Sequence, residues 1–420
     1  MSVQVSMANT KSGTCRSFCV TSSKSDPPLK GIRVLDMSRV LAGPFCSMTL
    51  SDLGAEVIKV EIPGRGDDTR AFPPYIDGES SYFMSLNRGK KSITMNLKDD
   101  DATKAFHRIA EKCDVVLENF RPGVTSRLGL GYETLCKLNP RIIYCSISSF
   151  GQTGPSAQLP GYDLIIQGMG GLMGLTGEPG RPPVRVGMAV TDLCAGMYAV
   201  IGILSALRTR EETGRGQYID VSMLDGSLSW MTYAAGNYFA TGVNPPRMGS
   251  AHPSIAPYQA FPTGDGKYIL IACGNDRLWG MMLEAMGDKK LGDDPRFTTN
   301  ALRVENMDTL IPLLETEFMK KPRDEWLEKL RGIGFPCGPV YTMDEMFSDP
   351  QVLARGMLKE VQHPTAGKIK QIGTVLKFSE SMCSIQSPPP VLGQDTDEVL
   401  TAIAGLSPEE VERLREKQAI

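Results

Sequence analysis

The sequence predicts an α/β fold: a large domain built on a parallel, Rossmann-like sheet, followed by a smaller α+β domain. From residue 29 onward, continuously apolar, β-rich segments alternate with helix-sized intervals, which is typical of a parallel sheet covered by helices on both faces. Past residue 224 the chain becomes rich in aromatic residues, Pro and Gly. A length of 420 residues is also large for a single core.

Each element follows from its own local signal. A run rich in Ala, Leu, Met and Ile predicts a buried helix over 193–210, which ends in basic residues before Gly214. Residues 263–268 read as a hairpin turn, and Ser407, Pro408 and Glu410 predict a final helix that begins with a capping box. Apolar, β-rich runs predict six strands, at residues 32–38, 56–61, 92–97, 113–120, 141–151 and 217–223. In such a sheet, ligands bind beyond the carboxyl ends of the strands.

These elements divide the chain into four parts. We expect a disordered or transit-peptide-like N-terminus at 1–28, a large α/β domain at 29–225, a small α+β domain at 226–340, and a C-terminal connector with helices returning to the large domain at 341–420. The first 28 residues are rich in Ser and Thr and carry Lys11, Arg16 and Lys24, with no acidic residue before Asp26. That composition favours a mitochondrial protein, and an unstructured tail on a cytoplasmic one is the alternative.

Composition excludes several kinds of partner and site. A net charge of −3 gives no sign of a nucleic-acid partner, and no uninterrupted apolar run reaches the ~18 residues of a membrane span, so we expect neither partner. The ten cysteines form no CxxC pair and there are only three histidines, so we expect no metal site. The glycine-rich residues 167–177 match neither GxGxxG nor a P-loop, although they could let backbone approach a ligand.

Asp192 stands at the head of the predicted buried helix, and two interpretations explain a carboxylate there. Asp is a good N-cap residue, because its side chain accepts a backbone N–H that the first turn leaves unpaired. Alternatively, a carboxylate at a helix N-terminus stays ionised and exposed, and can act as a nucleophile. The two roles are compatible.

Five segments resemble the class III coenzyme A transferases, a family that includes formyl-CoA transferase, carnitine-related CoA transferase and α-methylacyl-CoA racemase. The resemblance covers nearly the whole chain from Leu29 onward. The segments are residues 29–61, 87–97, 114–123, the stretch around Asp192, and 213–226. Residues 249–261 and 388–400 look closest to the succinyl-CoA:glutarate CoA-transferase branch. The resemblance implies an interlocked homodimer, a large domain that binds CoA, and acyl-CoA and free carboxylic acids as substrates, with no tightly bound cofactor.

The resemblance implies that Asp192 is the nucleophile, which would attack the thioester and carry the acyl group as a mixed anhydride while CoA stays bound. Backbone N–H groups in the glycine-rich loops could stabilise the developing oxyanions. Asp163 matches an acidic position near the family's active site, and either supports the reaction or ends a turn.

Other positions match family contacts to CoA. The resemblance implies that the loop after the first strand holds adenine and pantetheine. Arg127 would suit a phosphate, since guanidinium binds phosphate in a bidentate manner. The matched positions are Arg39, Val40, Leu41, Ala42, Asn119, Phe120 and Arg127.

A dicarboxylate substrate needs a cation for its remote carboxylate. Arg70, Arg247 and His252 are candidates, chosen by their charge and their placement near matched loops. We therefore expect an enzyme that moves CoA from succinyl-CoA to a dicarboxylic acid such as glutarate.

Two alternatives have their own signals. The related racemases carry a histidine in a Gly-His-Asp motif, where this chain has Tyr162, a poor base at neutral pH. A non-catalytic acyl-CoA-binding member of the family is the second alternative, since an aspartate at position 192 could be kept for capping alone.

Overall fold

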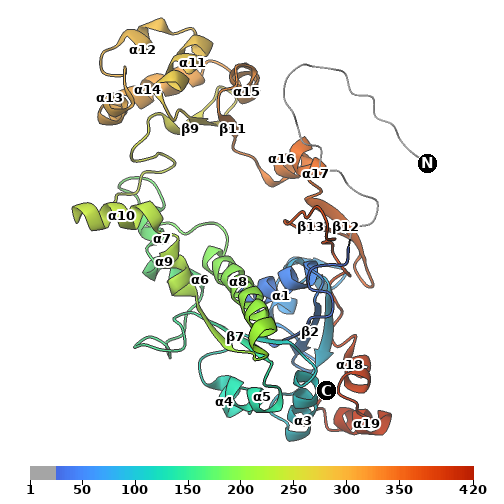
Figure 1. Ribbon diagram of the computed structural model, residues 1–420. Coiled ribbons are helices and arrows are strands. Elements are labelled where there is room, and N and C mark those ends of the chain that lie inside the picture. Colours follow the sequence, from blue (N-terminus) through green and yellow to red (C-terminus); the bar gives the residue numbers. More distant parts are fainter. Residues whose placement is uncertain (1–24) are drawn as a thin grey trace.

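The computed structural model describes residues 25–420, so most of the predicted N-terminal segment (1–24) lies outside the described residues. A six-stranded sheet in the order β5-β2-β1-β6-β7-β8 forms the centre of the molecule, and every neighbouring pair is parallel (Figure 1). Its strands are β1 (Arg33–Asp36), β2 (Glu56–Glu61), β5 (Lys90–Thr94), β6 (Val115–Glu118), β7 (Ile143–Ser148) and β8 (Tyr218–Ser222). The prediction of a parallel α/β sheet is confirmed, and all six predicted strands are present.

Helices cover both faces of this sheet, and each face has its own apolar core. One face carries α3 (Asp100–Ala110), α5 (Tyr132–Leu138), α18 (Thr396–Ala402) and α19 (Pro408–Glu416). The other carries α1 (Ala42–Asp52), α6 (Asp163–Met169), α8 (Val190–Thr213) and the start of α9 (Met223–Ser229). The layers arise because consecutive residues of a strand point to opposite faces: Val116 belongs to the first core, and Val115 and Leu117 to the second.

The predicted hairpin is confirmed within a second, three-stranded sheet in the order β11-β10-β9, which is antiparallel throughout. Its strands are β9 (Tyr258–Pro262), β10 (Tyr268–Ala272) and β11 (Cys337–Pro339). A separate core of Phe, Trp, Leu and Met side chains lies between this sheet and its helices. Those helices are α11 (Asp276–Met286), α12 (Lys289–Asp293), α13 (Asn300–Glu305), α14 (Met307–Phe318) and α15 (Arg323–Gly332).

Short elements fill the connections. The small sheet lies far from α18 and α19, and the chain reaches it through α10 and leaves it through α16 (Figure 1). The connecting elements are η1 (Asp68–Ala71), β3 (Tyr75–Ile76), β4 (Glu79–Ser80), α2 (Ser81–Leu86), α4 (Val124–Arg127), α7 (Leu172–Leu175), α10 (Thr232–Thr241), α16 (Met343–Ser348), α17 (Pro350–Ala354), β12 (Leu358–His363) and β13 (Gly367–Ile372). The capping box of Ser407 and Glu410 at α19 is confirmed, whereas the four domain ranges stay predictions.

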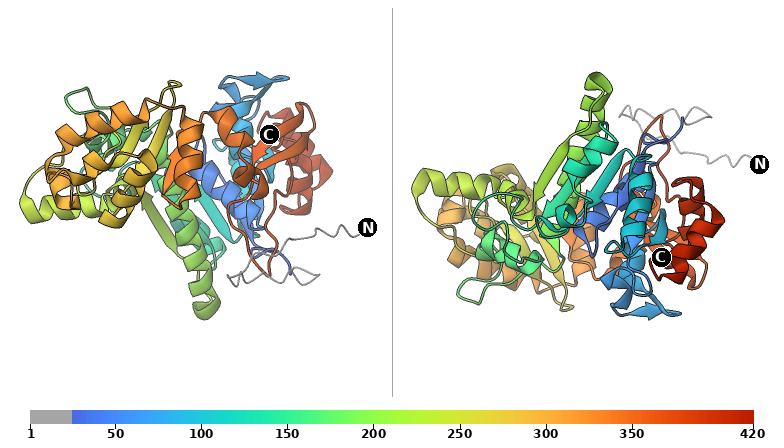
Figure 2. Two further views of the ribbon diagram at one scale, coloured as in Figure 1. Left: turned by 90° about the horizontal axis from the view of Figure 1, so that it is seen from above. Right: turned by 90° about the horizontal axis from the view of Figure 1, so that it is seen from below.

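The helix α8 packs closely along α1, and this contact decides where its first turn lies. A side-chain Cβ at Gly196 would stand 2.7 Å from the carbonyl oxygen of Ala42 and 2.9 Å from the Phe45 ring. Only glycine allows the two backbones to approach this closely. Views from above and below show one end of α8 projecting beyond the sheet (Figure 2). By length and composition α8 could cross a membrane, but half of its apolar window is buried in the protein, as for a core helix.

Candidate active site

A cavity of about 630 Å³ opens at the carboxyl edge of the six-stranded sheet. Residues that follow β1, β2, β5, β6 and β7 line it, together with Asp192 from α8 and Met223 from α9. This is where an open parallel sheet binds its ligands, because the loops that leave the strands converge there. Six of the seven predicted CoA-contact positions line this cavity: Arg39, Val40, Leu41, Ala42, Asn119 and Phe120.

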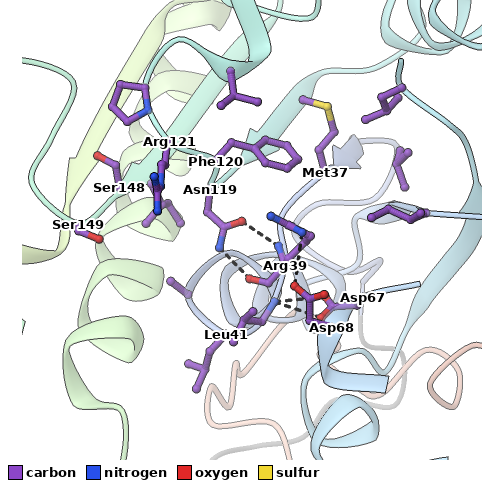
Figure 3. Close-up of a pocket in the computed structure, with 18 of the residues that line it drawn as sticks. Met37, Arg39, Leu41, Asp67, Asp68, Asn119, Phe120, Arg121, Ser148 and Ser149 are labelled. Carbon is purple, nitrogen blue, oxygen red and sulfur yellow. Dashed lines mark hydrogen bonds and ion pairs between the residues drawn. The ribbon is translucent and has the colours of Figure 1, made fainter. Parts of the chain in front are cut away.

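The loop after β1 is held in place by the loop after β6. Asn119 accepts the backbone N–H of Arg39 through Oδ1 at 2.8 Å and donates to the backbone oxygen of Arg39 through Nδ2 at 2.7 Å. Figure 3 shows this pair of bonds on one side of the loop, with Asp67 and Asp68 on the other. The Asn119 amide is therefore occupied at both ends by backbone, so its main contribution to this site is to fix the loop.

Asp192 lies in the first turn of α8, but it does not cap the helix. The N-cap residue of α8 is Ala189, whose side chain has no group that can cap the helix. The prediction that Asp192 caps α8 is therefore wrong. Asp192 is partly buried, faces the cavity, and forms no hydrogen bond or ion pair with any of the described residues 25–420. A carboxylate with no structural partner at the edge of a ligand-sized cavity is available for chemistry.

Burial changes the charge of this carboxylate. Burial, with the nearby negative charge of Asp163 as a second cause, raises the pKa of Asp192 to about 7. A helix N-terminus stabilises a carboxylate by only about 0.3–1 kcal/mol, whereas one pKa unit corresponds to about 1.4 kcal/mol, so burial outweighs the helix end. The expectation of an exposed, fully ionised Asp192 is therefore wrong: near neutral pH the carboxyl is divided between its two forms.

Asp163, on α6, supplies the missing cap from a different helix. Its Oδ1 accepts the backbone N–H of Thr191 at 2.9 Å and the Thr191 hydroxyl at 2.8 Å, one residue before Asp192. Gln167, one turn further along α6, donates to Asp163 Oδ2 at 2.7 Å and accepts the N–H of Val186 at 2.8 Å. Asp163 and Gln167 thus fix the segment that leads into α8, and with it the position of Asp192.

Tyr82, on α2, is a functional candidate that the sequence reasoning missed. Burial, followed by the negative charges of Asp192, Asp67 and Asp163, raises its pKa, so the phenol stays protonated near these carboxylates. Its ring packs edge-on against Phe72 at a centroid distance of 5.5 Å. A neutral hydroxyl here can donate to a carboxylate or an anhydride oxygen. The only sequence signal was its place just before the matched segment 87–97.

The positive charges of the cavity differ from those predicted. Arg39 is present, with its guanidinium 5.3 Å from the Phe120 ring centroid and 3.4 Å from Asp68. Arg121 and Lys98 also line the cavity, are exposed, and form no ion pair among the residues that the structure describes. Arg121 sits within the matched segment 114–123, so that motif could have indicated it. Arg127, in contrast, is exposed on α4 and does not line the cavity.

None of the three predicted cations for a remote carboxylate lines the cavity. Arg70 binds Glu61 through two hydrogen bonds of 2.7 Å and packs over the Phe83 ring, so its charge is already paired. Arg247 donates to the backbone oxygen of Arg181 at 2.6 Å. His252 packs between Tyr233 and Tyr258, at centroid distances of 5.9 and 5.4 Å.

Comparison with known proteins identifies the family. The model of CoA-transferase family III matches residues 29–396, most of the chain. The chain belongs to CoA-transferase family III. It is 44% identical to a succinyl-CoA:glutarate CoA-transferase of Mus musculus, over 92% of this chain and 89% of that protein. It is 47% identical to an acetyl-CoA:oxalate CoA-transferase of Acetobacter aceti, over 86% of this chain and 91% of that protein.

A solved structure agrees with this assignment. The crystal structure of a CaiB/BaiF family protein from Brucella suis is 43% identical and superimposes with a TM-score of 0.83, covering 90% of this chain and all of that one. The enzyme is therefore a family III CoA-transferase, a class that acts on CoA thioesters. No group of three or more metal-ligating side chains lies among residues 25–420.

Proposed function

We propose that this transferase moves CoA from succinyl-CoA to a dicarboxylic acid such as glutarate, with Asp192 as the nucleophile. The observation that carries the proposal is the Asp192 carboxylate, which faces the cavity at the carboxyl edge of the sheet without a structural partner. The names of the relatives support the substrates: the mouse protein is a succinyl-CoA:glutarate CoA-transferase, and so is a human protein of 44% identity.

The proposed chemistry balances without an added reagent. Asp192 attacks the thioester carbonyl carbon, the C–S bond breaks, and CoA leaves as the thiolate, which gives a succinyl-aspartyl anhydride. A carboxylate oxygen of the acceptor attacks the aspartyl carbonyl, succinate leaves, and a second anhydride forms. The CoA thiolate then attacks the acceptor's carbonyl carbon and releases Asp192 as the carboxylate.

The cavity offers groups for each part of the substrates. Arg39, Arg121 and Lys98 provide the positive charge that the CoA phosphates require. The first turn of α1 has no side-chain cap, so its backbone N–H groups can stabilise an oxyanion as each anhydride forms. Ser148 lines the cavity with a hydroxyl that has no partner among the described residues, so it can donate to the acceptor acid.

We also propose that the enzyme is a homodimer. Apolar side chains stay exposed along α8 and α10, where a second copy could cover them. They are Met197, Tyr198, Ile201, Leu204, Tyr233, Tyr238 and Phe239, with exposed fractions of 37–80%. A mitochondrial location, proposed from residues 1–28, is checked by imaging the full-length chain against one that starts at residue 29.

Acyl exchange by the purified protein tests the main proposal. Succinyl-CoA is incubated with a panel of acids that includes glutarate and oxalate, and the CoA thioesters formed are identified by mass spectrometry. We expect glutaryl-CoA, and we expect Asp192→Asn to lower the rate by at least about 10³-fold, since an amide at this position cannot form the anhydride. Glu212→Gln, an exposed change at the other end of α8, is the matched control and should retain full activity.

The acetyl-CoA:oxalate relative, at 47% identity, supports a second pair of substrates. A panel run with acetyl-CoA as donor distinguishes the two, because formation of oxalyl-CoA without glutaryl-CoA would reassign the acceptor. The racemase alternative is disfavoured because none of the chain's three histidines lines the cavity. Exchange of the substrate's α-proton in deuterated water, without acyl transfer, would favour the racemase alternative over the transferase.

A further inference from the structure

Side chains hold five consecutive backbone polar groups in the loop after β1. The N–H of Ser38 donates to Asp36 Oδ1 at 2.8 Å, and the carbonyl of Ser38 accepts Lys59 Nζ at 2.8 Å. The N–H and the carbonyl of Arg39 both bind the Asn119 amide, as described above. The N–H of Val40 donates to both carboxylate oxygens of Asp67 at 3.3 Å. Because side chains bind this unbroken run of five polar groups, the surroundings impose the conformation of the backbone from Ser38 to Val40.

The backbone conformation at position 40 is one that valine disfavours. Val40 has φ +67°, in the left-handed region. That region is a genuine outlier for a β-branched residue, and such strain persists only where surrounding contacts maintain it. The contacts at Arg39 and Val40 are therefore the ones that maintain it here.

Asp67, which accepts the Val40 N–H, is a buried carboxylate. Its carboxylate and the Lys59 ammonium form an ion pair of 2.9 Å, and both side chains are fully buried. Although burial favours the neutral acid, Lys59 and hydrogen bonds from Thr69 hold the pKa of Asp67 well below its usual range. The acceptor that binds the Val40 N–H is thus a permanent anion, fixed by Lys59 and Thr69.

The residues just after Val40 form the part of the loop that meets the nucleophile. Leu41 and Ala42 line the same cavity as Asp192, and α1 begins at Ala42. Because α1 contacts α8 at Gly196, one turn after Asp192, a change in the path of Val40 would displace the start of α1 relative to Asp192.

We propose that Asp67 is a positioning residue, whose Lys59-paired carboxylate holds Val40 in its left-handed conformation and thereby places the start of α1 against Asp192. The effect on turnover rests on the proposed function, whereas the effect on the backbone does not. Asp67 takes no part in bond making or breaking.

A double-mutant cycle with Val40→Gly tests the proposal. Glycine adopts positive φ without strain, so a loop with glycine at position 40 no longer needs the anion. Asp67→Asn exchanges one of the two oxygens that the Val40 N–H binds for an NH₂ group, which cannot accept it. We therefore expect this change to lower kcat by about 10- to 100-fold in the natural chain, the size of effect that a misplacement near 1 Å produces. In the Val40→Gly background the same change should lower kcat less than about threefold. The cost of leaving Lys59 unpaired is common to both backgrounds and cancels.

The neighbouring acid provides the matched control. Asp68→Asn removes a negative charge from the same cavity, but Asp68 pairs with Arg39 and Arg65 side chains and does not bind the loop backbone. Val40→Gly should therefore not reduce any loss that Asp68→Asn causes. Equal losses from Asp67→Asn in both backgrounds would overturn the proposal.

Hydrogen–deuterium exchange separates this proposal from the proposed function, because it needs no activity. Asp67→Asn should speed exchange of the amide at residue 40 at least tenfold, whereas Asp68→Asn should leave it within twofold. Unchanged exchange in Asp67→Asn would overturn the proposal even if the protein proved to be an active transferase. If the natural chain transferred no acyl group, only the proposed function would fail.

Discussion

At the scale of single residues, the proposed role of Asp192 as the nucleophile places two opposing demands on it. A nucleophile must be ionised, yet burial, with Asp163 as the second cause, raises the pKa of Asp192 to about 7. Burial also removes water from the carboxylate, and water would otherwise hydrolyse an anhydride. In the proposed mechanism, the partly buried position therefore lowers the ionised fraction of Asp192 but protects the anhydride from water.

This pKa predicts the pH dependence of the first step. Only the carboxylate attacks, so kcat/KM for the acyl-CoA should fall as pH decreases, reaching half its maximum near pH 7. The profile is measured by initial rates between pH 5.5 and 8.5, with CoA affinity measured alongside to separate binding from attack. A flat profile down to pH 5.5 would contradict the prediction.

Asp163 should shift that profile. Asp163→Asn removes the second cause of the raised pKa, so the pKa of Asp192 should decrease and the acidic limb should move to lower pH. Asparagine retains an acceptor for Thr191, so the first turn of α8 keeps its cap. Glu178→Gln, which changes an acid outside the cavity lining, is the comparison and should leave the limb in place.

The sequence indicated the residues that belong to motifs, but could not indicate their partners. Asp192 and the loop at 39–42 were found by position. The pairing of Arg70 with Glu61 was not, because it depends on a contact between separate parts of the fold. Tyr82 was missed for the same reason: the negative charge of Asp192 acts on its hydroxyl only in the folded chain.

At the scale of elements, two neighbouring helices fix the position of the first two turns of α8. Its first turn is capped by Asp163 from α6, and its second turn meets α1 through Gly196. A helix held in this way places Asp192 through two contacts that are distant in sequence.

Two helical glycines allow a matched test of the α1–α8 contact. Gly196→Ala would place a Cβ 2.7 Å from the Ala42 oxygen, and the resulting overpacking should lower the free energy of unfolding by about 1–3 kcal/mol and slow turnover. Gly280→Ala, in α11, meets nothing within 4 Å and should raise stability by about 0.5–1 kcal/mol. Urea unfolding of both variants measures the difference; equal effects would contradict the packing argument.

Element types were predictable wherever the apolar pattern was strong. The strands of the parallel sheet other than β8 are buried on both faces, so their composition alone identifies them. The start of α8 was placed too late, at Leu193 with Asp192 as its cap instead of at Val190, because its cap comes from Asp163 and leaves no local signal.

At the scale of the whole molecule, the exposed apolar side chains of α8 predict an interface. Ile201, 56% exposed near the middle of α8, should lie within it. Ile201→Asp should convert the dimer into a monomer of about half the mass in size-exclusion chromatography with light scattering. Leu138→Asp, a similar change at an exposed residue of α5, should leave the mass unchanged. A natural chain that is monomeric at micromolar concentration would contradict the dimer.

Residues 396–419 complete the apolar core that covers one face of the six-stranded sheet. Val399, Leu400, Val411 and Leu414 pack in the same cluster as Phe106, and the backbone oxygen of Ala419 accepts the N–H of Asn96 in the cavity wall. During synthesis, this segment emerges from the ribosome after all six strands of the sheet. Until then the nascent sheet has one face uncovered, and such surface is what chaperones bind. The six strands can pair early, but the cavity acquires its finished wall only after residues 396–419 have emerged.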